Sequence, residues 1–143
     1  MKVILSIAVG GNKVQQLLYH SAWNKQVDST LDQQIQKAYI QTRDDEDQVI
    51  VPLRQAVNHK GDYLLTVLLH NRKQQTLNLS TVHLSVSSPN FKANQQQFSS
   101  AEWSIAPMTS APWTFIFSQA NYSGELTDDV SNLTIDITSF ESN

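Results

Sequence analysis

The segment DYLLTVLLHN, residues 62–71, decides the fold class of this chain. If it is extended, it is apolar on both faces, because Tyr63, Leu65, Val67 and Leu69 alternate with Leu64, Thr66 and Leu68. A strand covered on both faces lies inside a sheet rather than at its rim. Polar turns, NHKGD at 58–62 and NRKQQ at 71–75, bound the segment. We therefore predict a central, covered strand here.

The segments on either side of this strand also have the pattern of strands. QVIVPLRQAV, residues 48–57, places Val49, Val51 and Leu53 on one face and Pro52 on the other. Proline cannot donate to a strand ladder, so this segment is predicted to be an edge strand or a strand with a bulge. TLNLSTVHLSVSS alternates as well, and its register slips between Leu79 and Val82, where we expect a bulge.

The C-terminal half continues as strands and turns. SSPNFKANQQQ is interpreted as a loop, FSSAEWSIAP and APWTFIFS as strands joined by PMTSAP, and SNLTIDITSF as the last strand. Trp113, Phe115 and Phe117 share one face of a strand, and we predict that they fill the interior of the fold. In the last strand, one alternating set is expected to face inward (Leu133, Ile135, Ile137) and the other outward (Asn132, Thr134, Asp136).

The first nine residues allow two interpretations. One lysine followed by VILSIAV resembles a very short signal peptide, but no clear cleavage site follows. The interpretation that we favour is a strand, with Gly10-Gly11-Asn12 as a turn and KVQQLLYHSAW as a returning strand. The spacing of Val14, Leu17 and Leu18 would also suit a helix.

One helix is predicted, STLDQQIQKAYIQ at residues 29–41. Its apolar residues form a single stripe (Leu31, Ile35, Ala38, Tyr39). Thr30 and Gln33 have the spacing of a capping box, and Asp28 and Asp32 suit the positive end of the helix. The acidic run DDED at 44–47 lacks the spacing of a calcium loop and is interpreted as a solvated linker.

About seven strands separated by turns, with one N-terminal amphipathic helix, are typical of an antiparallel β-sandwich of immunoglobulin-like type. The length of 143 residues predicts a single domain, residues 1–143. The fold class is therefore mainly β.

Composition excludes several classes of function. There are no cysteines, so disulfides and thiolate metal sites are excluded. The net charge is −3 and no run of Lys and Arg exists, which argues against a nucleic-acid partner. No stretch approaches the apolar length of a membrane span. We expect a soluble protein that stays in the cytoplasm.

No motif for chemistry stands out. His20, His59, His70 and His83 have no metal-ligand spacing, and there is no nucleophile elbow or glycine-rich phosphate loop. We expect no catalytic residue, no metal and no cofactor. A hydrolase whose site is assembled from distant residues stays open as an alternative. So does a carbohydrate-binding module, whose exposed platform would be Trp103.

Three segments in order resemble the SLAP domain of Gram-positive bacteria, a family named after an S-layer assembly protein tied to accessory Sec export. They are LLYHSAWNKQVDSTLDQQIQKAY, GDYLLTVLLHNRKQQTLNLSTVHLSV and IAPMTSAPWTFIF. The residues that carry the resemblance, expected to be structural, are Trp23, Asn71, Pro112, Trp113, Phe115 and Phe117. Two positions depart from the family pattern, since His70 and Ala111 stand where the family usually has arginine.

The resemblance implies a non-catalytic, protein-binding domain that serves protein export or cell-envelope assembly. Two candidate partner surfaces follow from the sequence. One is the predicted edge strand with Val49 and Val51. The other is a proline-rich loop, residues 105–112, with Pro107 and Pro112 beside Trp103. The partner would be export machinery, an exported precursor, or a second copy of the chain.

Overall fold

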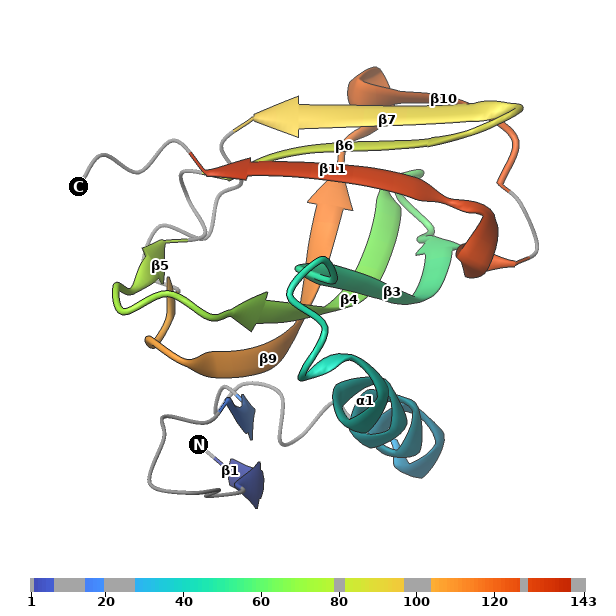
Figure 1. The fold of residues 1–143 in the computed structure, drawn as a ribbon. Helices are drawn as coiled ribbons and strands as arrows, with labels where there is room; N and C mark the ends of the chain where they lie inside the picture. Colours follow the sequence, from blue (N-terminus) through green and yellow to red (C-terminus); the bar gives the residue numbers. More distant parts are fainter. Residues whose placement is uncertain are drawn as a thin grey trace. The chain divides into compact units, whose positions relative to one another are not determined.

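The computed structural model describes residues 2–6, 15–19, 28–78, 82–96, 104–126 and 129–139. This part of the chain is mainly β, with one α-helix, as predicted (Figure 1). In chain order the elements are β1 (Lys2–Ser6), β2 (Gln16–Tyr19), α1 (Ser29–Thr42), β3 (Ile50–Val57), β4 (Tyr63–Asn71), β5 (Leu77–Asn78), β6 (Val82–Ser88), β7 (Phe91–Gln96), β8 (Ser104–Ile105), β9 (Thr109–Phe117), η3 (Gln119–Asn121), β10 (Tyr122–Gly124), η4 (Val130–Asn132) and β11 (Thr134–Ser139).

The strands form open sheets, consistent with a β-sandwich. One sheet has the order β1-β2-β9-β4-β3, a second has the order β10-β7-β6-β11, and β5 pairs with β8. β4 therefore lies between two strands and is buried along almost its whole length, which confirms the prediction of a central strand. β3 lies at the end of its sheet among the described strands, which confirms the predicted edge strand with Pro52.

The pairing directions include one that the sequence did not indicate. β1 and β2 are antiparallel, as expected for the predicted N-terminal hairpin, with a register shift between Val3 and Leu5. β2, however, pairs with β9 in parallel. Thr66 of β4 bonds to Thr114 of β9. His70, four residues later in β4, bonds to Ser110, which lies four residues earlier in β9. β4 and β9 are therefore antiparallel.

The chain divides by its internal contacts into two compact units. Unit 1 comprises Met1–Val51, Leu68–Thr76 and Ile105–Trp113, and unit 2 comprises Pro52–Val67, Leu77–Ser104 and Thr114–Asn143. Three strands (β3, β4 and β9) pass from one unit into the other. A single domain over residues 1–143 stays a prediction.

Unit 1 contains the helix. The predicted apolar stripe of α1 is buried (Leu31, Ile35, Ala38, Tyr39). The predicted capping box of Thr30 and Gln33 is wrong, because the helix begins at Ser29 and Asp28 is its N-cap, with a carboxylate that accepts a bond from the Leu31 N–H at 2.7 Å. A capping residue must stand just outside the helix to reach its free N–H groups, and Thr30 already lies inside.

Tyrosine hydroxyls link the same helix to β2 and to the residue before it. Tyr19 in β2 donates to Asp32 at 2.5 Å, and Tyr39 donates to the backbone carbonyl of Gln15 at 2.6 Å. Burial raises the pKa of both tyrosines above the usual value, so both hydroxyls remain neutral donors at physiological pH. The helix is thereby held against the start of the sheet by buried, fully protonated phenols.

Unit 2 has two layers. One is the antiparallel sheet β10-β7-β6-β11, and the other is formed by the parts of β3, β4 and β9 that belong to this unit. Aromatic rings pack between the layers: Tyr63 of β4 lies 4.7 Å from Phe91 of β7, 5.5 Å from Phe117 of β9 and 5.8 Å from Tyr122 of β10, measured between ring centroids. These contacts make Tyr63 the centre of the core of unit 2.

Two predictions about loops are wrong. The segment interpreted as a loop after Ser88 is the strand β7, which forms a tight hairpin with β6. Its buried residues, Phe91 and Ala93, alternate with exposed Lys92 and Asn94, so the polar composition reflects a strand with one solvated face. The proline-rich loop is also shorter than predicted, because β9 already begins at Thr109.

Some predicted features lie outside the described residues. These are the Gly10-Gly11-Asn12 turn, Trp23, the bulge between Leu79 and Val82, and Trp103.

Candidate functional site

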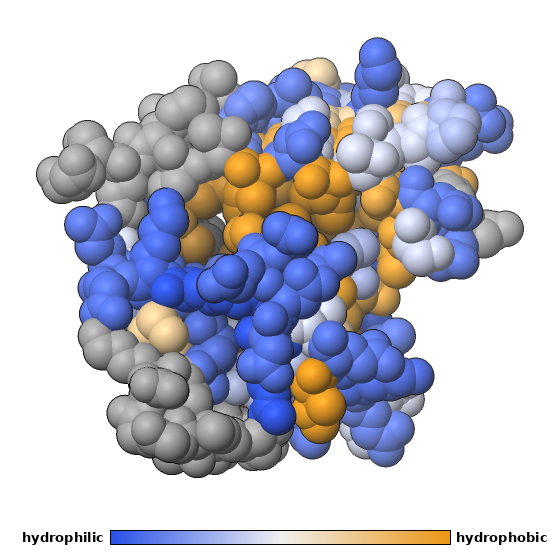
Figure 2. Space-filling model, in the orientation of Figure 1, coloured by the Kyte–Doolittle hydropathy of each residue, from blue (hydrophilic) through white to orange (hydrophobic). Residues whose placement is uncertain are grey.

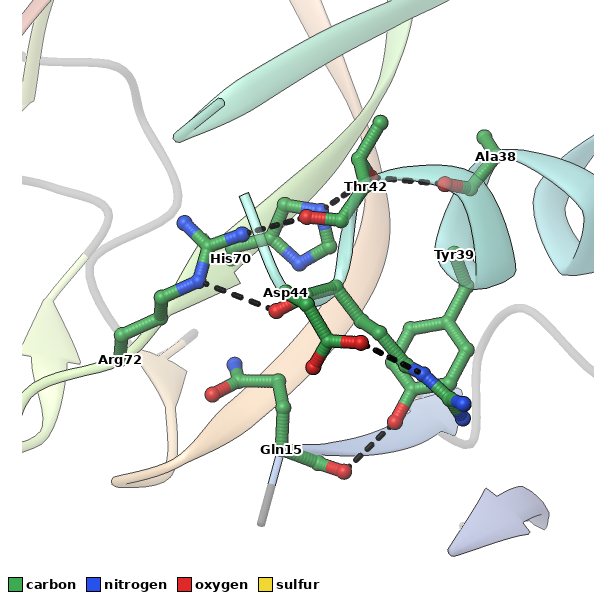
Figure 3. Close-up of polar contacts among 8 residues, drawn as sticks. Gln15, Ala38, Tyr39, Thr42, Asp44, His70 and Arg72 are labelled. Carbon is green, nitrogen blue, oxygen red and sulfur yellow. Dashed lines mark hydrogen bonds and ion pairs between the residues drawn. The ribbon is translucent and has the colours of Figure 1, made fainter. Parts of the chain in front are cut away.

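A group of hydrogen-bonded polar side chains is buried in unit 1, where α1, β4 and β9 meet (Figure 3). His70 of β4 is 3% exposed, and its Nδ1 lies 2.6 Å from the hydroxyl of Ser110 on β9. Its Nε2 lies 2.6 Å from the hydroxyl of Thr42 at the end of α1. Gln15 donates from Nε2 to Ser110 at 3.1 Å and to the Asn71 carbonyl at 3.0 Å.

The outer bonds of this network fix the direction of the inner ones. The Thr42 hydroxyl donates to the Ala38 carbonyl at 2.7 Å, so it accepts from Nε2–H of His70. In a neutral imidazole Nδ1 then carries no proton and accepts from the Ser110 hydroxyl, whose oxygen accepts from Gln15. With a neutral ring, the network runs from Gln15 through Ser110, His70 and Thr42 to Ala38 with every donor directed at an acceptor.

The electrostatic surroundings favour the same neutral state. Burial, followed by the positive charge of Arg72, lowers the pKa of His70 to about 4. A second proton would also leave Ser110 facing an N–H donor where it now donates. The neutral imidazole occupies one of the two positions where the family resemblance implies arginine.

Arg72 closes the end of the helix. Its guanidinium donates to three backbone carbonyls, to Thr42 at 2.7 Å, to Gln48 at 2.8 Å and to Arg43 at 3.4 Å. The last carbonyls of a helix have no partner within the helix, and a cation there also complements the helix dipole. Arg72 thus holds the exposed acidic turn, residues 44–47, which links α1 to β3 as predicted.

Asn71 ties the turn after β4 to the segment that leads into β9. Its amide donates to the carbonyls of Gln75, Ile105 and Ala106 at 2.8, 3.0 and 3.1 Å. Its side-chain oxygen accepts from the Lys73 N–H at 3.2 Å. A buried side chain with both ends bonded to backbone holds these segments together.

The Ser110–His70 pair has the contact of a nucleophile and its base, but not the access. Ser110 is fully buried and His70 nearly so, so no substrate can reach the hydroxyl. Among the described residues there is also no group of three or more His, Asp or Glu that could hold a metal ion. The arrangement of these groups stabilises the fold of unit 1.

The predicted partner surfaces are only partly exposed. Val49, just before β3, is 42% exposed, and Val51 is half-buried. Pro107 is half-buried in the turn before β9. Pro112 is buried within β9, so in this structure it is not part of an exposed surface. β9 passes between β2 and β4, which explains this burial.

The aromatic residues of β9 lie in the interior, as predicted. Phe115 and Phe117 are fully buried and Trp113 is 6% exposed. Trp113 therefore offers no platform for a sugar. A surface hollow of about 310 Å³ in unit 2 has Tyr122 and Asn121 on its wall. The Tyr122 ring packs on Tyr63 and Phe91, and its hydroxyl donates to the Gly61 carbonyl at 2.6 Å. These contacts give Tyr122 a role in the packing of unit 2.

Sequence reasoning missed Gln15, Thr42 and Ser110, which come from three separate segments of the chain: the residue before β2, the end of α1 and β9. The one signal available was the run His70-Asn71-Arg72, three polar residues that directly follow a covered apolar strand. Such a run predicts buried hydrogen bonds, but their partners depend on which strands become neighbours.

Within the described residues, no helix is long and apolar enough to cross a membrane.

Comparison with known proteins gives one match. Neither the curated proteins nor the solved structures contain a significant match to this chain. The family model of the SLAP domain matches residues 17–138, which is most of the chain and runs from within β2 to within β11. The chain therefore belongs to the SLAP domain family.

Proposed function

We propose that this protein is a non-catalytic protein-binding module, an accessory factor in protein export or cell-envelope assembly. The observation that carries the proposal is the position of β3 at the end of its sheet among the described strands. An edge strand offers unpaired backbone N–H and C=O groups, the usual basis for binding an extended peptide. The resemblance to the SLAP family supplies the context of export.

The positions of the described residues favour the binding of a partner over catalysis. The Ser–His pair of unit 1 is buried, whereas aliphatic side chains at both ends of β3 are exposed: Val49 is 42% exposed and Val57 is 45% exposed. Exposed aliphatic residues close to the last strand of a sheet favour a polypeptide partner.

The test is affinity capture of the tagged protein from a lysate of its own host at low salt, with mass spectrometry of what is retained. A variant with Val57→Lys places a charge at the β3 edge. Ile116→Lys is the matched control, because Ile116 is also exposed (51%) but lies on β9 between two other strands.

We expect export machinery or exported precursors to be retained by the unmodified protein and by the Ile116→Lys control, and to be lost with Val57→Lys. Retention of no host protein, or retention that is equal in all three samples, would contradict the proposal.

A further inference from the structure

The chain enters β9 through a short apolar turn, Ala106-Pro107-Met108. Met108 has a φ of 54°, and in the described part of the chain it is the one residue other than glycine with a positive φ. Proline at the second position of a turn and a positive φ at the third are typical of a type II turn, in which glycine usually occupies the third position. Here a long apolar side chain stands at that position.

The conformation of Met108 destabilises the fold. An L residue in the left-handed region is strained because its Cβ lies too close to the following carbonyl oxygen, a contact that glycine avoids. Residues held in such conformations cluster at binding and catalytic sites, where the strain is part of the function. Met108 is half-buried and does not belong to the buried core. The strain therefore points to a role for this side chain at the surface.

Every backbone carbonyl from residue 105 to residue 108 is bonded within the chain. The Asn71 amide donates to the first two carbonyls at 3.0 and 3.1 Å. The Thr109 hydroxyl donates to the third, that of Pro107, at 3.0 Å, and the Gln16 N–H donates to the last at 3.1 Å. Strand addition depends on backbone groups that have no partner. We therefore expect a partner to recognise this turn by its side chains.

The turn is also fixed to the segment that follows β4. The Met108 N–H donates to the Lys73 carbonyl at 3.1 Å, which places Lys73 beside the turn. Lys73 and Ala106 are exposed, and Pro107 is half-buried. Figure 2 shows a weakly hydrophobic patch, with hydrophilic surface beside it, at the place where the chain enters β9 in Figure 1. A turn that is already rigid loses little conformational freedom when a partner binds.

We propose that the turn Ala106-Pro107-Met108 is an apolar anchor that inserts the Met108 side chain into an apolar pocket of a partner protein, while Lys73 faces a carboxylate at the rim of that pocket. This inference rests on the proposed protein-binding function and adds a second contact surface to it. The flexible, polarisable thioether of methionine adapts to irregular apolar pockets and is common on binding surfaces. An apolar centre with a polar rim is the usual arrangement of a protein interface.

A second copy of this chain fits less well than a different protein. A hollow of about 310 Å³ lies in unit 2, but its wall carries Lys92 with neutral residues and no carboxylate. A second copy that received the turn there would bring its Lys92 towards Lys73, and like charges across an interface repel.

A photo-crosslinking experiment tests the contact at the residue itself. The chain has two methionines, Met1 and Met108, so photo-methionine places a light-activated group at position 108 with a single other site in the chain. The tagged full chain that carries this analogue is illuminated in a lysate of its own host, and mass spectrometry identifies the crosslinked peptides. Met108→Leu is the control, because it keeps an apolar side chain but takes up no analogue at this position.

We expect position 108 to crosslink to a segment of a host protein that contains apolar residues and at least one Asp or Glu, and we expect this product to be absent from the control. Crosslinks from position 108 that stay within the chain would overturn the inference. So would crosslinks that join two copies of it.

Substitutions distinguish a contact role of Met108 from a structural role. Met108→Gly and Met108→Ala both remove the anchor, but only glycine relieves the backbone strain. Both variants should retain roughly tenfold less of the crosslinked host protein, although the glycine variant should unfold at a higher urea concentration than the alanine variant. Met108→Leu should retain nearly as much as the unmodified protein. Full retention by the glycine variant, or retention that follows stability, would overturn the inference.

The charge beside the turn is tested by salt. Retention by the unmodified protein should fall as the salt concentration rises, and Lys73→Gln should remove most of this dependence, because a charge at the rim of an interface acts mainly through long-range attraction. Lys60→Gln is the matched control, since Lys60 is also exposed but lies in the turn before β4. Equal salt dependence of the Lys73→Gln variant and the unmodified protein would contradict the carboxylate at the rim.

The same samples separate this inference from the proposed function. If host proteins are retained and are lost with Val57→Lys, but position 108 gives no crosslink to them and Met108→Gly retains them fully, this inference fails while the protein-binding function stands. If the unmodified protein retains no host protein, the proposed function fails and this inference fails with it.

Discussion

At the scale of the residue, the polar network of unit 1 depends on one protonation state. With His70 neutral, the chain of donors from Gln15 to Ala38 has Nδ1 of His70 accepting a bond from Ser110. The family resemblance implies arginine at this position, and an arginine could not accept that bond.

This protonation state predicts a dependence of stability on pH. The pKa of His70 is lowered from 6.5 to about 4 in the folded protein, so between these values the unfolded chain binds a proton that the native state does not. The free energy of unfolding contributed by this residue is therefore complete above pH 6.5 and falls as the pH is lowered, by at most roughly 1.4 kcal/mol per unit.

Urea unfolding at a series of pH values measures this effect, with His70→Gln as the reference because it removes the titrating group. The variant should be less stable at neutral pH and show a flatter profile between pH 4 and 6.5 than the unmodified protein. Parallel profiles for the two proteins would mean that His70 is not the group responsible.

Trp113 supports a second prediction at this scale. It is 6% exposed within β9, so Trp113→Ala should lower the free energy of unfolding by roughly 3–5 kcal/mol. Ile116→Ala, on the exposed face of the same strand, should change it by no more than about 0.5 kcal/mol. Chemical denaturation compares the two. A stable Trp113→Ala protein that has lost its partner would show instead that this aromatic residue faces a partner.

At the scale of the element, the start of α1 distinguishes two capping schemes that the sequence leaves close together. Asp28 bonds to the Leu31 N–H, whereas Thr30 lies within the helix. Asp28→Ala should therefore cost about 1 kcal/mol of stability, and Thr30→Ala should cost much less. The midpoints of thermal unfolding of the two variants measure this difference. A larger loss of stability for Thr30→Ala would show that the capping box is the scheme in use.

Strand composition explains where the prediction of elements succeeded and failed. β4 was recognisable because both of its faces are buried, so nearly every residue is apolar. β7 was mistaken for a loop because only Phe91 and Ala93 record its inner face, while its other residues meet solvent. The first residues of β9 were mistaken for a loop because Pro107 and Pro112 suggested a turn on both sides.

At the scale of the whole molecule, neither unit is a continuous piece of chain. Each consists of three segments, and β3, β4 and β9 run through both. Local unfolding of one unit would have to break these strands in the middle. We therefore expect the described chain to unfold in one transition.

Two probes test this expectation. Fluorescence of Trp113, in a protein whose other tryptophans are replaced by phenylalanine, reports on unit 1. Amide exchange of β6 and β7 reports on unit 2. Coincident midpoints in urea are expected, and two separated midpoints would show that the units unfold independently.

The sequence by itself determined the fold class, the helix with its buried stripe, the central strand β4, the edge strand β3 and the burial of Trp113, Phe115 and Phe117. Each of these follows from periodicity or from proline, which act within a few residues of one another. Membership of the SLAP family was also indicated by motifs within single segments.

Only the tertiary structure decided the rest. The parallel pairing of β2 with β9, the network through His70 and the three carbonyls held by Arg72 each join segments far apart in the chain. Which segments become neighbours depends on how apolar faces across the whole chain are buried together. That choice is made by packing, and no local pattern records it.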